Sequence, residues 1–267
     1  MKFLIKQDWE KILSKLSLNK INSQKESPAE KLFFDISQRI KELTTLKKFD
    51  HTTYGIAMTL FHYYICFNDI RSIDSIEICF ACLYMSSKIQ FYNLPLKQFI
   101  IDYKDYIKKS SGFEKKPEPD FIKYEIQLYS QLGYDLDIET PYQFFYNNFY
   151  IRYINNNNKE KIEKIKNFCF NLINDTYTRP LSIYYHPKIL YLSCIIISLK
   201  FLEFNEFDIN KLIKDENLDL IGECMEKIYQ IYSNYLEDNS NKDNNNTNND
   251  KKINSENKII NNNNKIN

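Results

Sequence analysis

Apolar residues recur at helical spacing along the chain, in segments separated by short polar stretches. In "SPAEKLFFDISQRIKEL", Ser27 is placed to cap a helix, Pro28 stands at its first position, and Glu30 completes a capping box. The apolar residues that follow at intervals of three and four are Leu32, Ile36, Ile40 and Leu43. This pattern predicts an amphipathic helix with one face turned toward a core.

Four more helices are predicted before residue 140. One covers residues 51–66, and the next is capped by Asp74, with Glu77 three residues later. A fourth lies within residues 94–107. The fifth ends near Gly133, which suits the left-handed position that follows many helices.

The same order of signals then begins again. Thr140 is placed to cap a helix that Pro141 opens, another helix is predicted over residues 162–174, and Pro187 opens the next. Two further helical stretches are expected within residues 207–236.

Two of the predicted helices are similar in sequence, "ACLYMSSKI" at residues 81–89 and "SCIIISLKF" at residues 193–201. The matched pairs are Cys82 with Cys194, Ser86 with Ser198 and Lys88 with Lys200. Each pair is separated by 112 positions (200 − 88 = 112), and the flanking pattern of turn, cap and amphipathic helix repeats as well. Small residues along both segments would let neighbouring helices approach closely, so each is expected to be the central helix of a bundle.

These patterns predict an all-α fold built from two tandem five-helix repeats. The first repeat is placed at residues 29–139 and the second at residues 140–236, and both are of ordinary domain size. A short helix and a link are expected at residues 1–28. Residues 237–267 are rich in Asn, Lys and Asp without an apolar period, so we expect this tail to be disordered.

Composition supports helices and excludes several classes of partner. Among 267 residues the chain has 21 Tyr and 19 Phe but only 4 Gly and 7 Pro, which favours long helices over a many-turned β fold. The formal net charge is +1, so direct binding to nucleic acid is not expected. The longest apolar run, residues 189–199, is too short to cross a bilayer. No signal peptide is recognised, and the cysteines fall mostly in apolar runs, which favours a reducing intracellular setting.

No set of residues predicts catalysis, a cofactor or a metal. Cys79 and Cys82 have metal-ligand spacing, but no second pair follows and both lie in an apolar helix, which favours core packing. His186 precedes a proline and is interpreted as a turn residue. The sequence contains no Gly-rich loop for a nucleotide. We therefore expect no enzymatic activity of the chain's own.

One charged residue breaks the pattern of the fifth predicted helix. Glu125 falls within the apolar stripe that includes Phe121 and Leu128, and a buried carboxylate is costly unless it is paired. In the simpler interpretation, Glu125 lies at the rim and reaches water. In the alternative, it pairs with Lys88 on an apolar surface, which would be wasteful in a monomer and suits half of a protein interface.

The same residues carry a resemblance to a known family. "IEICFACLYMSSKIQ" resembles the core of the cyclin box, whose central helix ends in Ala-x-Lys. "KYEIQLYSQLGYDLDIETPYQFF" is similar to the family's next landmark, a Glu followed by Leu-x-x-Leu-x-Phe-x-Leu and then Pro-Tyr. "LINDTYTRPLSIYYHPKILYLSCIIISLKF" resembles the second box of transcription-type cyclins, the group that includes cyclins C, H, K, L and Q. The resemblance covers roughly residues 29–236.

The resemblance implies a regulatory subunit that forms a heterodimer with a cyclin-dependent kinase. Lys88 and Glu125 fall on the family's paired residues that hold the activating helix of the kinase. The apolar positions around them correspond to Ile89, Tyr129, Tyr134 and Leu136. It also implies action on RNA polymerase II with other transcription machinery as partners, and residence in the nucleus, with the cytoplasm as a second location.

Several positions depart from the family pattern. Gln90 and Phe91 replace the Glu-Glu that follows the lysine, and Tyr63 stands where the second helix usually has Arg. The first helix carries "LFFDISQRIKEL" in place of the Met-Arg-Ala-Ile-Leu docking motif, which favours the transcription type. Two alternatives remain, a cell-cycle cyclin and a non-kinase scaffold of the general transcription factor type. The scaffold would need a basic face for DNA.

Overall fold

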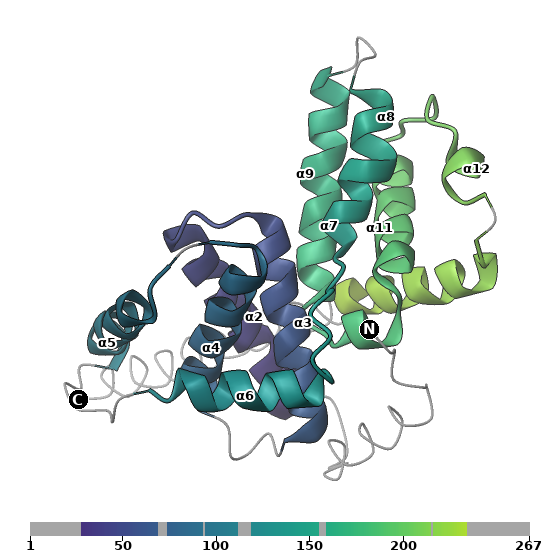
Figure 1. Ribbon diagram of the computed structural model, residues 1–267. Coiled ribbons are helices and arrows are strands. Elements are labelled where there is room, and N and C mark those ends of the chain that lie inside the picture. Colours follow the sequence, from purple (N-terminus) through teal and green to yellow (C-terminus); the bar gives the residue numbers. More distant parts are fainter. Residues whose placement is uncertain are drawn as a thin grey trace, which may run out of the picture. The chain divides into compact units, whose positions relative to one another are not determined.

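The structure is a computed structural model that describes residues 28–68, 74–92, 94–111, 119–154, 159–214 and 216–233. The described part is helical throughout, as the sequence predicts (Figure 1). The predicted N-terminal helix and link lie outside the described residues apart from residue 28, and the predicted disordered tail lies outside them entirely. The described residues up to 224 belong to one compact unit, and residues 225–233 belong to a second.

Five helices make up the described first half. They are α2 (Pro28–Leu46), α3 (His51–Phe67), α4 (Ser75–Ile89), α5 (Leu96–Ser111) and α6 (Phe121–Gln131). The predicted cap Asp74 accepts hydrogen bonds from the backbone N–H groups of Ile76 and Glu77 at 3.0 and 3.1 Å. Gly133 has a φ of +62° after α6, the left-handed conformation that the sequence predicts there.

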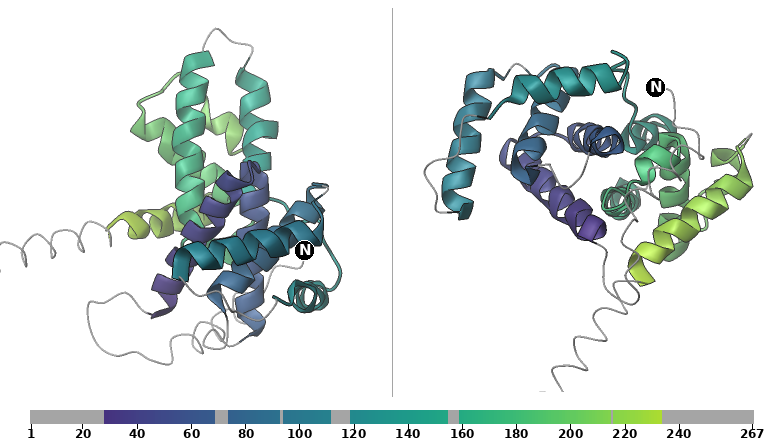
Figure 2. Two further views of the ribbon diagram at one scale, coloured as in Figure 1. Left: turned by 90° about the vertical axis from the view of Figure 1, so that its left-hand side faces the viewer. Right: turned by 90° about the horizontal axis from the view of Figure 1, so that it is seen from below.

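Helix α4 is the centre of this half. It packs against α2, α3, α5 and α6 (Figures 1 and 2), and every residue from Ile78 to Ser87 is buried. Its two buried serines donate hydrogen bonds to carbonyls of their own helix: Ser86 to Leu83 at 2.9 Å and Ser87 to Tyr84 at 2.7 Å. Their hydroxyls are thereby satisfied without a polar partner from another helix, so apolar neighbours can surround the helix on all sides.

The second half begins with a rod in which α7 (Pro141–Phe144), the π-helix η2 (Phe145–Tyr150) and α8 (Ile151–Tyr153) follow without a break. Thr140 stands at the predicted N-cap position, and its backbone N–H donates a hydrogen bond to the Gln143 side chain at 2.8 Å. The π-helical stretch and the short helix α10 (Leu181–Tyr184) are not predicted by the sequence pattern. The other helices are α9 (Lys159–Thr176), α11 (Pro187–Phe201), α12 (Ile209–Leu212) and a last one over residues 218–233.

Helix α11 has the central place in the second half that α4 has in the first. It packs against α7, α9 and α10, and residues Ile189 to Leu199 are buried (Figure 1). The correspondence extends past the helix ends. Phe91 and Glu203, again 112 positions apart (203 − 91 = 112), both follow their helix in the left-handed conformation, with φ of +57° and +55°.

Helix α3 joins the two halves, because it packs against both α7 and α10. Gly55 lies at the tightest point: a methyl group there would come within 2.9 Å of the Tyr177 hydroxyl and 3.0 Å of Tyr142. His62, which is fully buried, shares a hydrogen bond of 2.8 Å with the hydroxyl of Ser182 on α10. The predicted boundary at residues 139/140 falls just before α7 and stays a prediction, since both halves belong to the same compact unit.

Candidate functional site

Lys88 and Glu125 form an ion pair between the end of α4 and the middle of α6. The Glu125 side chain is 14% exposed and that of Lys88 is 41% exposed, so the acid lies deeper than the base. The ammonium group also lies 5.3 Å from the centre of the Tyr84 ring. The structure therefore brings together the two residues that the sequence singles out, and it pairs the carboxylate in the apolar stripe of α6.

The electrostatics at Lys88 favour its charged form. Burial disfavours the charge on Lys88, but the hydrogen bond and the negative charge of Glu125 outweigh this cost and hold the pKa of Lys88 above its usual value. Burial and the neighbouring Glu125 carboxylate raise the pKa of Tyr129 as well. The ammonium group has three N–H donors. Those not used by Glu125 remain available to acceptors on a partner.

The other predicted site residues lie on the same two elements or directly after them. Ile89 ends α4 and is half-buried, while Tyr129 stands one turn after Glu125 on α6 and is also half-buried. Tyr134 is 76% exposed and has a φ of +63°, and Leu136 is half-buried in the extended segment that follows. Their contact with a kinase stays a prediction.

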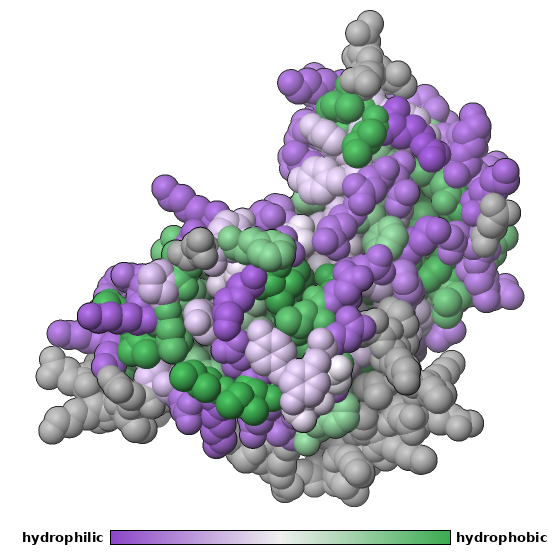
Figure 3. All heavy atoms as spheres, viewed as in Figure 1, coloured by the Kyte–Doolittle hydropathy of each residue, from purple (hydrophilic) through white to green (hydrophobic). Residues whose placement is uncertain are grey.

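Three further exposed apolar side chains, within three residues of Lys88 or Glu125 in the sequence, were not predicted as site residues. Phe91 is 94% exposed, and Ile122 and Ile126 on α6 are 53% and 62% exposed. Figure 3 shows apolar and aromatic side chains gathered over α6. The spacing of Ile122 and Ile126 by one helical turn, beside the core stripe of α6, is the sequence signal that could have identified them. Exposed apolar side chains around a partly desolvated ion pair are typical of the core of a protein interface.

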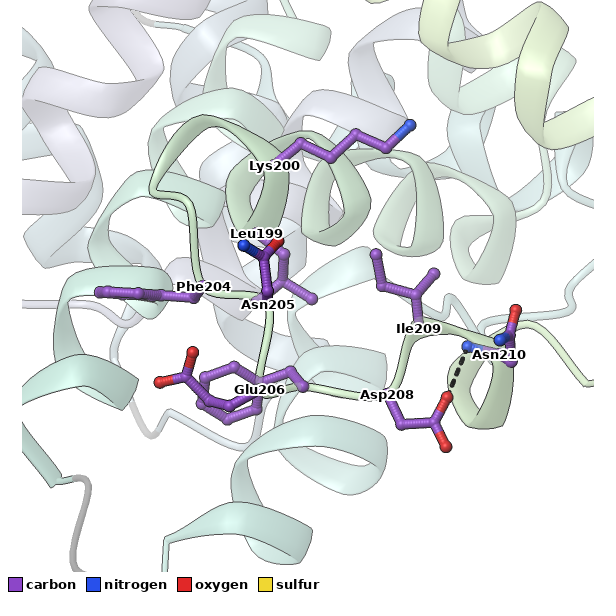
Figure 4. Close-up of a pocket in the computed structure, with 9 residues that line it drawn as sticks. Leu199, Lys200, Phe204, Asn205, Glu206, Asp208, Ile209 and Asn210 are labelled. Carbon is purple, nitrogen blue, oxygen red and sulfur yellow. Dashed lines mark hydrogen bonds between the residues drawn. The ribbon is translucent and has the colours of Figure 1, made fainter.

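The second half does not reproduce this pair. Lys200, the counterpart of Lys88, forms no ion pair with any residue that the structure describes. It borders a hollow of about 360 Å³, where Figure 4 shows its side chain extending away from the carboxylates of Glu206 and Asp208. Glu206 pairs with Lys161, and Asp208 caps the backbone of Asn210 at 3.1 Å. The acids of this hollow are thus already engaged within the chain.

The cysteines and the histidine considered above as metal-binding or catalytic candidates have structural roles. Cys79 and Cys82 are completely buried in α4, where burial raises the pKa of both thiols. His186 caps α11 by accepting a hydrogen bond from the backbone of Lys188 at 3.1 Å. Over the described ranges no cluster of three or more metal-binding side chains is found. Within the same ranges no helix is long and apolar enough to span a membrane.

Comparison with known proteins identifies relatives in sequence and in fold. No protein-family model matches the sequence. The chain is 19% identical to cyclin-K of Danio rerio over 197 residues, which cover 68% of this chain and 45% of the relative. It is also 19% identical to human cyclin-K over 195 residues, which cover 68% of this chain and 33% of the relative. The chain therefore spans less than half the length of these relatives.

Two solved structures share the fold. A chain of the yeast TFIIK (Kin28/Ccl1/Tfb3) complex superposes with a TM-score of 0.59 at 18% identity, covering 85% of this chain and 96% of that one. A chain of the CAK complex of Chaetomium thermophilum bound to ATP-γ-S superposes with a TM-score of 0.53 at 12% identity, covering 84% and 70%. The chain is thus similar in sequence to two cyclins, and it shares its all-helical fold with chains of these two complexes.

Proposed function

We propose that this chain is the activating regulatory subunit of a cyclin-dependent protein kinase, with no catalytic activity of its own. The observation that carries the proposal is the Lys88–Glu125 ion pair at the junction of α4 and α6, set among exposed apolar side chains. A surface of this kind is suited to a protein partner, because apolar contacts provide affinity and the charged pair fixes the position of the partner.

The geometry suggests how activation works. Unused N–H donors of Lys88 can bind backbone carbonyls of the kinase segment, while Glu125 can accept from its N–H groups. Ile89 and Tyr129, with the exposed Tyr134 and the half-buried Leu136 that follow α6, would cover the apolar face of that segment. A kinase must hold its own Lys–Glu ion pair in place to position ATP phosphates. A partner that binds only the active arrangement of that helix shifts the population toward it.

We assign the chain to the transcription-regulating type, acting with the kinase on RNA polymerase II in the nucleus. Both sequence relatives are cyclins K, and one matched solved chain comes from the TFIIK complex. The absent docking motif in α2 points the same way. Further transcription proteins are the other partners we expect.

The test is affinity purification of the full chain from cells, with mass spectrometry to identify the kinase. The Lys88→Ala/Glu125→Ala double variant removes the pair from the surface of the two helices. We expect it to lose co-purification of the kinase by at least tenfold, since truncating charged residues at the centre of an interface is costly. Circular dichroism should show unchanged helix content.

The matched control is Glu160→Ala/Lys164→Ala, which removes an exposed ion pair of α9 in the second half. It should recover the kinase at the wild-type level. The site assignment is wrong if the Lys88/Glu125 variant retains the kinase as well as this control does.

A further inference from the structure

A pocket of about 300 Å³ lies between the end of α2, the start of α3 and the end of α9. It involves neither α4 nor α6, so it is separate from the elements that carry Lys88 and Glu125. Its walls come from both halves of the chain: Lys41 and Lys48 from the first, with His51 and Tyr54 on α3, and Asn174 from the second.

Two nearly buried side chains in the wall have hydrogen-bond donors without a partner. Asn174 is 6% exposed, and its carbonyl oxygen accepts from the Tyr142 hydroxyl at 2.7 Å, which leaves its NH₂ group unused. Tyr54 is 3% exposed, and its hydroxyl makes no hydrogen bond to any residue that the structure describes. Neither donor atom is itself sealed inside the protein, so both are open to the pocket and can be donated to a ligand that accepts hydrogen bonds.

The remaining groups give the pocket a positive rim. Lys41 and Lys48 are exposed, and neither forms an ion pair within the described part of the chain. The ring of His51 is held 5.5 Å from Tyr142 and 4.9 Å from Phe170, which fixes it at the pocket wall.

One acid also lines the pocket. Asp50 accepts hydrogen bonds from the backbone N–H of Thr53 at 2.8 Å and from the Thr53 hydroxyl at 2.7 Å. Its carboxylate therefore caps α3 and offsets the partial positive charge at the N-terminus of that helix. The two lysines remain as the charged groups available to a ligand.

We propose that this pocket binds a phosphate group, either as the free ion or as the phosphomonoester of a phosphorylated serine or threonine in a peptide. A phosphate at neutral pH carries a charge between −1.5 and −2 and offers three strong acceptor oxygens. Those oxygens match the Tyr54 hydroxyl, the Asn174 amide and the lysine ammonium groups, all of which donate. A carbonyl-bearing neutral ligand would satisfy the donors but leave the two positive charges uncompensated.

The hollow beside Lys200 shows the contrast. It is of similar size, but it has one lysine, Lys200, with two acids, Glu206 and Asp208, whereas the proposed pocket has two lysines with one acid, Asp50. This charge balance does not favour a dianion in the hollow, and Lys200 can provide a control.

The experiment titrates the full chain, by isothermal calorimetry at low ionic strength, with three ligands. These are inorganic phosphate, a phosphoserine peptide and the same peptide without phosphate. We expect both phosphate-bearing ligands to bind and the unmodified peptide not to bind. Tyr54→Phe removes a single O–H donor and should weaken phosphate binding about tenfold. Lys41→Gln/Lys48→Gln should weaken it by at least as much and reduce its salt dependence.

Matched controls separate the pocket from general effects. Tyr191→Phe removes another buried hydroxyl without a hydrogen bond, and Lys200→Gln removes a lysine beside the other hollow. Both should bind phosphate as the wild type does, and so should Lys88→Ala/Glu125→Ala, which makes this test independent of the proposed kinase site.

The relative affinities identify the source of the phosphate. Binding of the phosphopeptide at least tenfold tighter than inorganic phosphate assigns the pocket to a phosphorylated peptide, and equal affinities assign it to the free ion. The proposal is overturned if neither phosphate ligand binds, if the unmodified peptide binds equally well, or if the Tyr54 and lysine variants keep the wild-type affinity.

Discussion

At the scale of single residues, Phe91 is held in a conformation that costs stability. Its φ of +57° places it in the left-handed region, which is unfavourable for residues other than glycine, and its side chain is 94% exposed and so gains little from packing. It lies two residues after Ile89, the last residue of α4. Strained residues of this kind collect at functional sites, and a contact between Phe91 and the partner would explain its presence.

Phe91→Gly should therefore stabilise the fold and weaken the complex. We expect the free energy of unfolding, measured with urea, to rise by roughly 0.5–1 kcal/mol as the left-handed strain is relieved. Binding of the kinase should fall, because a large apolar contact is lost. Glu203→Gly is the control, since Glu203 has the same conformation after α11. It should stabilise the fold equally and leave the kinase bound; equal binding by both variants would exclude Phe91 from the interface.

The candidate site shows which residues sequence reasoning can find. Lys88 and Glu125 could be predicted because a carboxylate within an apolar stripe needs a partner, and the structure provides one. Phe91 could not, since its special conformation follows from the way α4 ends, and no glycine marks it. The phosphate pocket was equally hidden: Tyr54 and Asn174 are 120 positions apart (174 − 54 = 120), and each is unremarkable in its own helix.

At the scale of elements, caps and spacing predict most helices, and packing decides the rest. The predicted starts at Pro28, Pro141 and Pro187 are those of α2, α7 and α11. Proline favours the first helical position for a local reason, because its φ is already helical and its missing N–H would have no partner there. The π-helix Phe145–Tyr150 has no such cause. Its aromatic rings pack on one another and on Phe170 of α9, with Phe145 and Phe170 5.1 Å apart. A widened helix is thus accommodated by contacts that the local pattern does not contain.

The fit between α3 and the second half gives a prediction at this scale. Gly55→Ala would place a methyl group within 2.9 to 3.1 Å of Tyr177, Tyr142 and Thr140, and the two tyrosine rings are fully buried. The gain in helix propensity is about 1 kcal/mol, whereas overpacking costs typically 1–3 kcal/mol. We expect a net loss of roughly 1 kcal/mol in the free energy of unfolding, measured by urea denaturation.

Gly222→Ala is the matched substitution. Gly222 lies in the helix over residues 218–233, and a methyl group there would meet nothing within 4 Å. This variant should stabilise the chain by about 0.5–1 kcal/mol. If Gly55→Ala stabilises the chain as Gly222→Ala does, α3 does not pack as tightly against the second half as described.

At the scale of the whole described unit, the two halves meet across groups that are sensitive to protonation. His62 of α3 is fully buried against Tyr177, and its ring shares a hydrogen bond with the hydroxyl of Ser182 in the second half. Burial lowers the pKa of His62 to about 3. In the unfolded chain the same imidazole titrates near its usual value of 6.5, so the unfolded state takes up a proton that the folded state does not.

The sign of the pH effect follows from this difference. Stability contributed by neutral His62 is complete above pH 6.5 and is lost as the pH falls toward 3, because protons then favour the unfolded state. Between pH 7 and pH 5 the loss from this one residue is about 2 kcal/mol. His62→Gln removes the titrating group but leaves the carboxylates and the other two histidines. Urea denaturation at both pH values should thus show a drop in the free energy of unfolding that is about 2 kcal/mol larger for the wild type than for His62→Gln. Ser182→Ala, which keeps the buried imidazole, should retain most of the pH dependence. If the free energy of unfolding falls equally for the wild type and His62→Gln, water reaches His62 between the two halves.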